Sequence, residues 1–381
     1  MTLLSEDALV ARVLGHIDAG TTDLAEAVYE VPVDHYASGE RLEAELERVF
    51  RRTATPFCPS AALPEAGSYV ARTVAGRPLV ATRGQDGVAR VFMNACRHRG
   101  MQVAEGAGCK KVLTCRYHAW TYGLDGSLRG VPDEYGFPGL DKREYGLVPV
   151  KAIERHGLVF VIQDGEAELD PALGQMAGLI GGKTRVLDQT IVEMEANWKL
   201  ICEGFLEGYH IRSTHTETFY PRQYDNVNVI EDFGRGNRVT FPYQAVEKQR
   251  AFPPGQRRAG GGMTSVWHIF PNVVISTFPK TRKITIVEPL APDRSRLETF
   301  IVTDAPETPE DNRLVDISRD FVAAGAEEDR MVVSAVQKGL ATGANAVLTF
   351  GLFEGALTRL HKEIDAAIRG EPQRPSGPQA S

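Results

Sequence analysis

Hydrophobic runs long enough to cross a bilayer are missing from this sequence. A membrane-spanning helix needs about 20 consecutive apolar residues, whereas the longest apolar runs here, such as residues 157–162, have the length of a β-strand. The first residues also carry neither the basic nor the apolar region of a secretory leader. We therefore expect a cytoplasmic protein that does not act in a membrane.

Cysteine is scarce, and positive charge is not in excess. The 381-residue chain has 5 cysteines, an odd number that argues against a disulfide framework and leaves metal binding as their more informative use. Lys and Arg number 43 against 50 Asp and Glu, which gives a net charge of -7. Because there is no global basic field, we expect neither nucleic acid nor an anionic membrane surface as a partner.

Nucleotide-binding loops are also absent. Residues 182–184 read Gly-Lys-Thr, like the end of a phosphate-binding P-loop, but Ala177 stands where that motif needs its first glycine. The sequence also has no Gly-x-Gly-x-x-Gly turn between a predicted strand and a predicted helix. Any electrons from a pyridine nucleotide are therefore expected to come from another protein.

The apolar pattern changes along the chain and predicts an α+β protein with two main domains. Short β-like runs separated by Gly, Pro and Asp predict an all-β domain, and strands between 225 and 304 with helices on either side predict an α+β domain. Helices are expected at about 3–17, 40–51, 198–212, 309–340 and 351–369. The predicted parts are N-terminal helices packed on the second domain (1–50), the all-β domain (51–165), the α+β domain (166–370) and a disordered tail (371–381).

A first cluster of potential metal ligands lies in the predicted all-β domain. Cys96, His98, Cys115 and His118 follow the spacing Cys-x-His-x16-Cys-x2-His, so that each half offers one thiolate and one imidazole. Two adjacent loops of this kind can place both Cys on one iron and both His on the other, as in a Rieske [2Fe–2S] centre. A zinc site is the alternative, although such sites normally pair Cys with Cys along the chain. Cys109 has no second cysteine to pair with and is expected to be a small buried residue.

A second cluster follows in the α+β domain, with the spacing Glu-x2-His-x4-His for Glu207, His210 and His215. Glu207 and His210 share one face of the predicted helix. His215 would lie about 140° away from His210 on a regular helix, so the two imidazoles converge only if the helix ends or distorts between them. Two imidazoles and one carboxylate form the facial triad of non-haem Fe(II) oxygenases. Ordinary surface or core histidines are the alternative.

The carboxylate of such a triad is expected on the helix predicted at 309–340, which begins after Thr308, a good N-cap residue. Asp329 shares a helix face with Val332, Val333 and Val336 and should therefore approach the core, where a metal would compensate its charge. Nearly the same argument holds for Glu328, and the periodicity does not choose between the two. A solvated acidic turn is the alternative.

Together these segments resemble the oxygenase (α) subunit of the Rieske non-haem iron oxygenases, which include aromatic ring-hydroxylating dioxygenases and related monooxygenases. The resemblance covers residues 45–340 and also rests on Asp125-Gly126, Asn197-Trp198-Lys199 and Gln337-x-Gly339-Leu340. It implies an all-β Rieske [2Fe–2S] domain and an α+β helix-grip catalytic domain with a central antiparallel sheet. It also implies a cyclic homotrimer that receives electrons from a ferredoxin, an NAD(P)H-dependent flavin reductase, or both.

The resemblance assigns roles to individual residues. It implies that the cluster is held by Cys96 and Cys115 on one iron and by His98 and His118 on the other. The family pattern places the third ligand of the mononuclear Fe(II) at the second residue of the Glu-Asp pair, so that the ligands are His210, His215 and Asp329. Glu207 matches the acid that links a cluster histidine of one subunit, here His118, to an iron-ligand histidine of its neighbour, here His210.

The expected function is that of a terminal oxygenase component that uses O2 to hydroxylate an aromatic or polycyclic substrate. Two departures from the family pattern bear on the substrate: Gly204 stands where many relatives have Asn, and Glu207 replaces the Asp of the best-known aromatic dioxygenases. The second departure is similar to monooxygenases that demethylate or cleave quaternary amines, which is the alternative function. A non-catalytic Rieske electron carrier is the second alternative.

The substrate pocket is expected along the strands at 263–288. A quaternary amine would need an aromatic cage for its cation. The aromatic residues available for such a cage, which are more often found in a core, are Tyr209, Phe219, Tyr220, Tyr224, Trp267 and Phe270.

Overall fold

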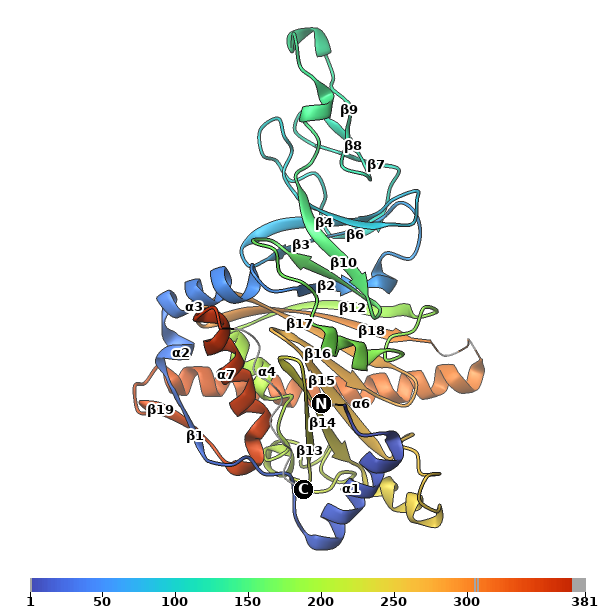
Figure 1. Ribbon diagram of the computed structural model, residues 1–381, viewed down its shortest axis with the longest axis vertical. Coiled ribbons are helices and arrows are strands. Elements are labelled where there is room, and N and C mark those ends of the chain that lie inside the picture. Colours follow the sequence, from blue (N-terminus) through green and yellow to red (C-terminus); the bar gives the residue numbers. More distant parts are fainter. Residues whose placement is uncertain (1, 305, 307, 372–381) are drawn as a thin grey trace. The chain divides into compact units, whose positions relative to one another are not determined.

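The computed structural model describes residues 2–304, 306 and 308–371. Within this range the chain forms two compact units (Figure 1). The β unit comprises residues 50–169 and 178–186, and the α+β unit comprises the described residues up to 49, 170–177 and those from 187 onward. Of the predicted disordered tail, only Glu371 lies among the described residues.

The β unit contains two antiparallel sheets. The larger has seven strands in the order β2-β11-β10-β5-β4-β3-β6, and the smaller has the order β7-β8-β9. The strands are short and end at turns rich in glycine, as the sequence predicted. Their bounds are β2 (Thr55–Pro59), β3 (Ser68–Val74), β4 (Arg77–Arg83), β5 (Ala89–Met93), β6 (Ala107–Cys109), β7 (Val112–Thr114), β8 (Thr121–Gly123), β9 (Leu128–Gly130), β10 (Pro149–Arg155) and β11 (Leu158–Ile162).

One core of the β unit contains both cysteines of the first ligand cluster. Cys96 and Cys115 are buried together with Phe92, Trp120 and Tyr122. The thiols thus lie among apolar side chains. Cys96 lies in the loop after β5, and Cys115 lies in the loop between β7 and β8. The prediction for Cys109 was wrong, because this residue is exposed at the end of the edge strand β6.

The α+β unit contains a curled antiparallel sheet of seven strands, in the order β12-β18-β17-β16-β15-β14-β13. Strands β1 and β19 pair with each other in a separate two-stranded sheet. This antiparallel sheet with surrounding helices agrees with the predicted fold class. The strands are β1 (Tyr29–Pro32), β12 (Arg185–Met194), β13 (Val229–Phe233), β14 (Gly236–Pro242), β15 (Met263–Ile269), β16 (Val273–Thr277), β17 (Arg282–Ala291), β18 (Arg294–Thr303) and β19 (Val347–Phe350).

The helices of the α+β unit differ from the prediction at one important place. The predicted helix at 198–212 is two short helices, α4 and α5, because α4 ends at Glu203 and Gly204 follows as its C-cap. The helix predicted at 309–340 is α6 and has the predicted ends. The α-helices are α1 (Glu6–Ala19), α2 (Asp34–Ala37), α3 (Gly39–Glu45), α4 (Trp198–Glu203), α5 (Ile211–Thr214), α6 (Pro309–Leu340) and α7 (Gly355–Ile368), with a π-helix at Leu46–Phe50.

A buried ion pair fastens the N-terminal helices to α4. The Lys199 ammonium lies 2.9 Å from both carboxylate oxygens of Glu45, and both side chains are inaccessible to solvent. The indole N–H of Trp198 donates to the same carboxylate at 2.8 Å. Asn197 caps α4 by accepting from the Lys199 N–H at 3.0 Å. The Asn-Trp-Lys segment is therefore a structural support for the residues that follow it.

The face of helix α6 that packs against the rest of the α+β unit differs from the predicted one. Val332 and Val336 are 41% and 39% exposed, whereas Gln337 is buried and Val333 lines a cavity. The covered stripe passes through Asp329, Val333 and Gln337, which are spaced four residues apart. The three valines thus do not share one buried face, although the conclusion that Asp329 points inward holds.

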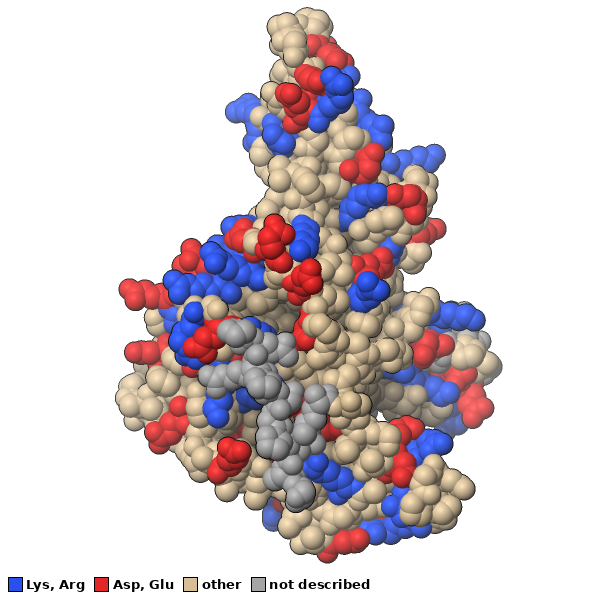
Figure 2. Space-filling model, in the orientation of Figure 1, with Lys and Arg blue, Asp and Glu red and all other residues tan. Residues whose placement is uncertain are grey.

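Among the described residues, no helix has the length and apolar character needed to cross a membrane. On the face drawn in Figure 2, acidic and basic side chains are interspersed rather than gathered into one field.

Candidate metal centres

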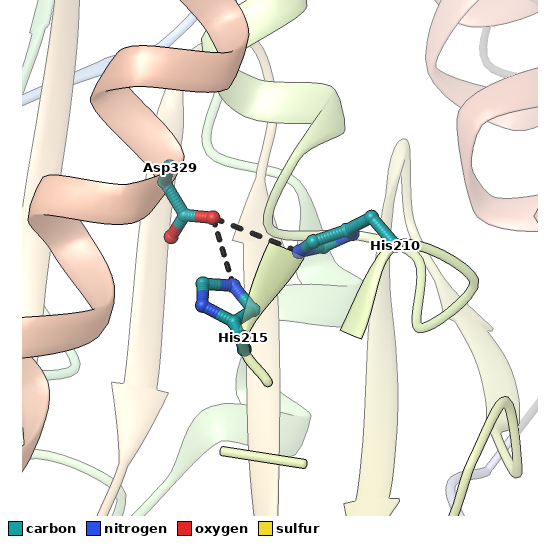
Figure 3. A group of neighbouring side chains, drawn as sticks. All are labelled: His210, His215 and Asp329. Carbon is teal, nitrogen blue, oxygen red and sulfur yellow. Dashed lines mark ion pairs between the residues drawn. The ribbon is translucent and has the colours of Figure 1, made fainter. Parts of the chain in front are cut away.

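His210, His215 and Asp329 converge on one point in the α+β unit (Figure 3). One ligand atom from each lies within 4.8 Å of the others. Asp329 Oδ1 is 3.0 Å from His215 Nε2 and 3.6 Å from His210 Nε2. The structure therefore brings together the three residues that the sequence singled out as mononuclear iron ligands.

The short length of α5, which ends at Thr214, makes this convergence possible. His210 is the N-cap and His215 the C-cap of α5, a helix of a single turn, and their ring centroids are 5.1 Å apart. Since His215 has left the helical conformation (φ -105°, ψ 39°), the angle of a regular helix does not separate the two imidazoles. The condition stated from the sequence, that the helix must end between them, is met.

Glu328 and Asp329 take different positions around His215. The Glu328 carboxylate lies 2.6 Å from His215 Nδ1 and accepts a hydrogen bond from the Thr218 hydroxyl at 2.6 Å. Asp329 instead faces the Nε2 atoms of both histidines. The periodicity of α6 could not distinguish these two neighbours, whereas the packing of α5 against α6 does.

Glu207 holds His210 in the corresponding way. Its carboxylate is hydrogen-bonded to His210 Nδ1 and accepts from the His210 backbone N–H at 3.1 Å. Burial lowers the pKa of His210, but the hydrogen bond and charge of Glu207, together with the charge of Asp329, outweigh it, so that this pKa lies above its usual value. The loop before α5 thus orients the imidazole through its Nδ1 side.

The donor set fits a divalent iron. Each Nδ1 is engaged by a carboxylate, which leaves both Nε2 atoms for a metal, as is usual for histidine ligands. His215 Nε2 is buried and has no hydrogen-bond partner among the described residues. Two imidazoles and one carboxylate on one side of the ion leave positions for O2 and substrate.

The residues of the first cluster lie in two loops of the β unit. Cys96 and His98 follow β5, and Cys115 and His118 connect β7 to β8. Both cysteines are free thiols and buried, while the two imidazole rings lie 4.6 Å apart between centroids and are at least partly exposed. Two buried sulfurs and two outer imidazoles are the arrangement that a Rieske [2Fe–2S] cluster requires.

Backbone turns shape both of these loops. The Gly100 N–H donates to Cys96 O at 2.8 Å, and the Ala119 N–H donates to Cys115 O at 3.0 Å. Gly100 (φ 79°) and Ala119 (φ 57°) adopt the left-handed conformation that such turns need. The Tyr122 hydroxyl lies 3.2 Å from Cys96 Sγ, and burial raises the pKa of this tyrosine. The phenol therefore stays neutral beside Cys96 Sγ.

Two adjoining cavities reach the mononuclear site. The first, here called the ligand-side cavity, has a volume of about 610 Å³, which includes space open to solvent, and is lined by residues that include His210, His215 and Asp329. The second, the sheet-side cavity, has a volume of about 1060 Å³ and lies among β12, β17, β18, α4 and α6. Gly204, Phe205, Lys283, Ala326 and Asp329 line both.

The lining differs from the aromatic residues considered from the sequence. Phe219 lines the ligand-side cavity, but Tyr209 is 59% exposed beside Phe353, and Trp267 is buried in the core. Strands β15 to β17 contribute to the lining, as predicted. The aromatic rings that the sequence did not point to come from four separate elements or loops: Phe205, Phe241, Tyr243 and Phe278.

Two family models match this chain. Residues 53–141 match the Rieske [2Fe-2S] domain, and residues 181–370 match the ring hydroxylating alpha subunit (catalytic domain). The chain belongs to the Rieske non-haem iron oxygenases. The first match identifies the metal group of the β unit as a [2Fe–2S] cluster rather than zinc, and the second is the domain that binds mononuclear iron in this family.

Curated relatives include both kinds of oxygenase considered from the sequence. The carnitine monooxygenase oxygenase subunit of Acinetobacter pittii (strain PHEA-2) is 33% identical over 233 residues, 57% of this chain and 62% of the relative. The alignment thus spans less than two thirds of that protein. The corresponding subunit of Escherichia coli (strain K12) is 27% identical over 337 residues, 83% of this chain and 85% of the relative. The biphenyl 2,3-dioxygenase subunit alpha of Rhodococcus jostii (strain RHA1) is 33% identical over 228 residues, 55% of this chain and 48% of the relative.

Solved structures of this Rieske oxygenase family share the fold. The quaternary ammonium Rieske monooxygenase CntA in complex with L-carnitine matches with a TM-score of 0.74 at 24% identity, over 96% of this chain and 99% of the other. Naphthalene 1,2-dioxygenase from Rhodococcus sp. bound to indole matches with a TM-score of 0.76 at 20% identity, with the same coverage. The arrangement of elements is therefore common to both kinds of oxygenase.

Proposed function

We propose that this chain is the terminal oxygenase component of an O2-dependent hydroxylase. The observation that carries the proposal is the convergence of His210, His215 and Asp329 in the wall of a cavity of about 610 Å³. A protein that only carries electrons has no need of a second iron site beside a pocket. When bound, the cluster supplies electrons and the mononuclear iron activates O2, while the protein positions the substrate and excludes water.

The proposed ligands follow the geometry of each unit. Cys96 and Cys115 would hold one iron of the cluster, and His98 and His118 would hold the other. The mononuclear iron would be held by His210, His215 and Asp329.

The Glu207 carboxylate is hydrogen-bonded to His210 Nδ1. In a homotrimer the same carboxylate would face His118 of the partner subunit and so connect the two subunits. An external ferredoxin or NAD(P)H-dependent flavin reductase would reduce the cluster.

The proposed substrate has an aromatic or polycyclic skeleton. Phe205, Phe219, Phe241 and Phe278 give the ligand-side cavity a largely apolar wall on which such a skeleton can stack. A quaternary amine is the second candidate, because the bridging acid is Glu207 and because curated relatives include carnitine monooxygenase subunits. The same rings could then surround the cation.

Metal analysis tests the proposal first. We expect about three irons and about two acid-labile sulfides per chain, with a Rieske signal in the EPR spectrum after reduction by dithionite. O2 uptake in the presence of a reductase should then be screened against indole, biphenyl, L-carnitine and glycine betaine. Two irons with two sulfides that do not increase after incubation with Fe(II) would instead indicate an electron carrier. Zinc without sulfide would contradict the proposal altogether.

A further inference from the structure

Lys283 is a basic residue in the cavity wall, and none of the described carboxylates bonds its ammonium group. It lies on β17 and lines both the ligand-side and the sheet-side cavity. Among the described residues no carboxylate is hydrogen-bonded to its ammonium group. The charges that act on this group are those of Asp329, which favours the charged form, and Arg330, which opposes it. The Lys283 Nζ atom lies over the Phe205 ring, 5.6 Å from the ring centroid. An aromatic face stabilises a cation only in part.

This arrangement is costly unless an anion joins it. Burial lowers the pKa of Lys283 to about 8, and the charge of Asp329 opposes that shift. Lys283 is half-buried, so burial disfavours its ammonium form, and a bound anion would favour that form again. A buried charge is normally paired. The cavity wall thus contains an ammonium donor to which none of the described carboxylates is hydrogen-bonded.

The other charged groups of the sheet-side cavity are engaged elsewhere or are acids. Arg330 pairs with Glu327, and Arg319 pairs with Asp316 at 3.1 Å. The acids that line this cavity are Asp188 and Asp329. Of these groups Lys283 is therefore the one with a charge available to bind an anionic ligand.

Hydroxyl groups lie next to Lys283 on the same face of the sheet. Residues two apart on a strand point to the same side, so Thr285 follows Lys283 on that face. Thr285 pairs with Thr299 across β17 and β18, and their hydroxyls are 3.3 Å apart. Both threonines line the sheet-side cavity. An ammonium group and two hydroxyls that line the same cavity can together bind both oxygens of a carboxylate.

We propose that Lys283, with Thr285 and Thr299, binds a carboxylate group of the substrate in the sheet-side cavity. Both cavities contain acids, Glu207 on the ligand side, Asp188 on the sheet side and Asp329 in both, whereas Thr285 and Thr299 line the sheet-side cavity alone. The carboxylate therefore anchors one end of the substrate and directs its remaining carbon skeleton toward His210 and His215. This inference rests on the proposed oxygenase function and names the class of substrate: an aromatic carboxylate or, for an amine substrate, a betaine.

Equilibrium binding tests this inference without turnover. Iron-loaded protein is titrated anaerobically at pH 7 by calorimetry with two pairs of probes, benzoate against benzamide and L-carnitine against choline. In at least one pair we expect the carboxylate to bind more tightly than its counterpart. We expect this preference to fall at least about tenfold in Lys283→Met, since a hydrogen bond to a charged group contributes about that much. Lys283→Arg should retain most of it.

The exposed Lys248 supplies the matched control, since Lys248→Met removes the same charge outside the cavity. If neither carboxylate binds the wild-type protein more tightly than its counterpart, the inference is overturned. It is also overturned if Lys283→Met keeps the full preference, or if this variant loses mononuclear iron, because Lys283 would then support Asp329. Failure of the wild-type protein to bind mononuclear iron would instead overturn the proposed function.

Discussion

Substitutions at positions 327, 328 and 329 test the assignment of the third iron ligand. Asp329→Ala removes the oxygen that faces both Nε2 atoms, at 3.0 Å from His215 and 3.6 Å from His210. We expect this variant to lose mononuclear iron. Glu328→Gln keeps the size of the side chain but removes the charge that holds His215 Nδ1 at 2.6 Å. Such a partner contributes about 10- to 100-fold to metal affinity, so Fe(II) binding should weaken by about 1.4–2.8 kcal/mol.

The assay is an anaerobic titration with Fe(II), in which acid-labile sulfide serves as an internal reference. Sulfide should stay at about two per chain in every variant, because the cluster lies in the other unit. Glu327→Gln is the matched control: its carboxylate is 60% exposed and pairs with Arg330 on the surface, where an ion pair contributes about 0–1 kcal/mol. Full iron in Asp329→Ala together with iron loss in Glu328→Gln would refute the assignment.

Three further predictions concern electron transfer, stability and pH. Glu207→Gln should keep both metals yet largely stop O2 consumption driven by a reductase, and unchanged coupled turnover would exclude the bridging role. Lys199→Met should lower the free energy of unfolding by about 3 kcal/mol in urea denaturation, because it leaves the buried Glu45 carboxylate without its lysine; a loss below about 1 kcal/mol would contradict this. Burial lowers the pKa of His268 to about 4, below its usual 6.5. Above pH 6.5 the imidazole is neutral in both the folded and the unfolded chain, and its burial does not reduce the free energy of unfolding. This free energy falls by about 3 kcal/mol as the pH drops toward 4. His268→Asn should show a smaller fall, and an equal fall would reject this cause.

Local sequence signals predicted several features of the protein well. The cluster ligands are only two or three residues apart within each loop, so their spacing already indicated how each pair is presented. The N-cap at Thr308 marked the start of α6, because its hydroxyl accepts from the Asp311 N–H at 3.1 Å, a contact within one turn. Short β-like runs also predicted strands in both units, while the antiparallel sheet of the α+β unit was implied by the family resemblance. In each case the interaction that shapes the element lies within a few residues.

Other features were misjudged where the local pattern was ambiguous. The helix predicted at 198–212 ends at Glu203, and no strong breaker marks that point apart from Gly204. Cys109 looked like a small core residue, yet it lies at a sheet edge where the side chain remains exposed. The aromatic residues considered for a cage were chosen by position in the sequence, and Tyr209 turned out to face outward.

The sequence by itself determined which Cys, His and acidic residues are the candidates to bind iron. The periodicity of α6 left Glu328 and Asp329 equivalent, and only the tertiary structure shows that Asp329 faces the Nε2 atoms, because this depends on how α6 packs against α5, more than a hundred residues away in the chain. The tertiary structure also placed Lys283 beside Phe205 in the substrate cavity. The residues next to a lysine in a strand do not show which groups its side chain will contact. Those groups lie on elements that come together only when the chain folds.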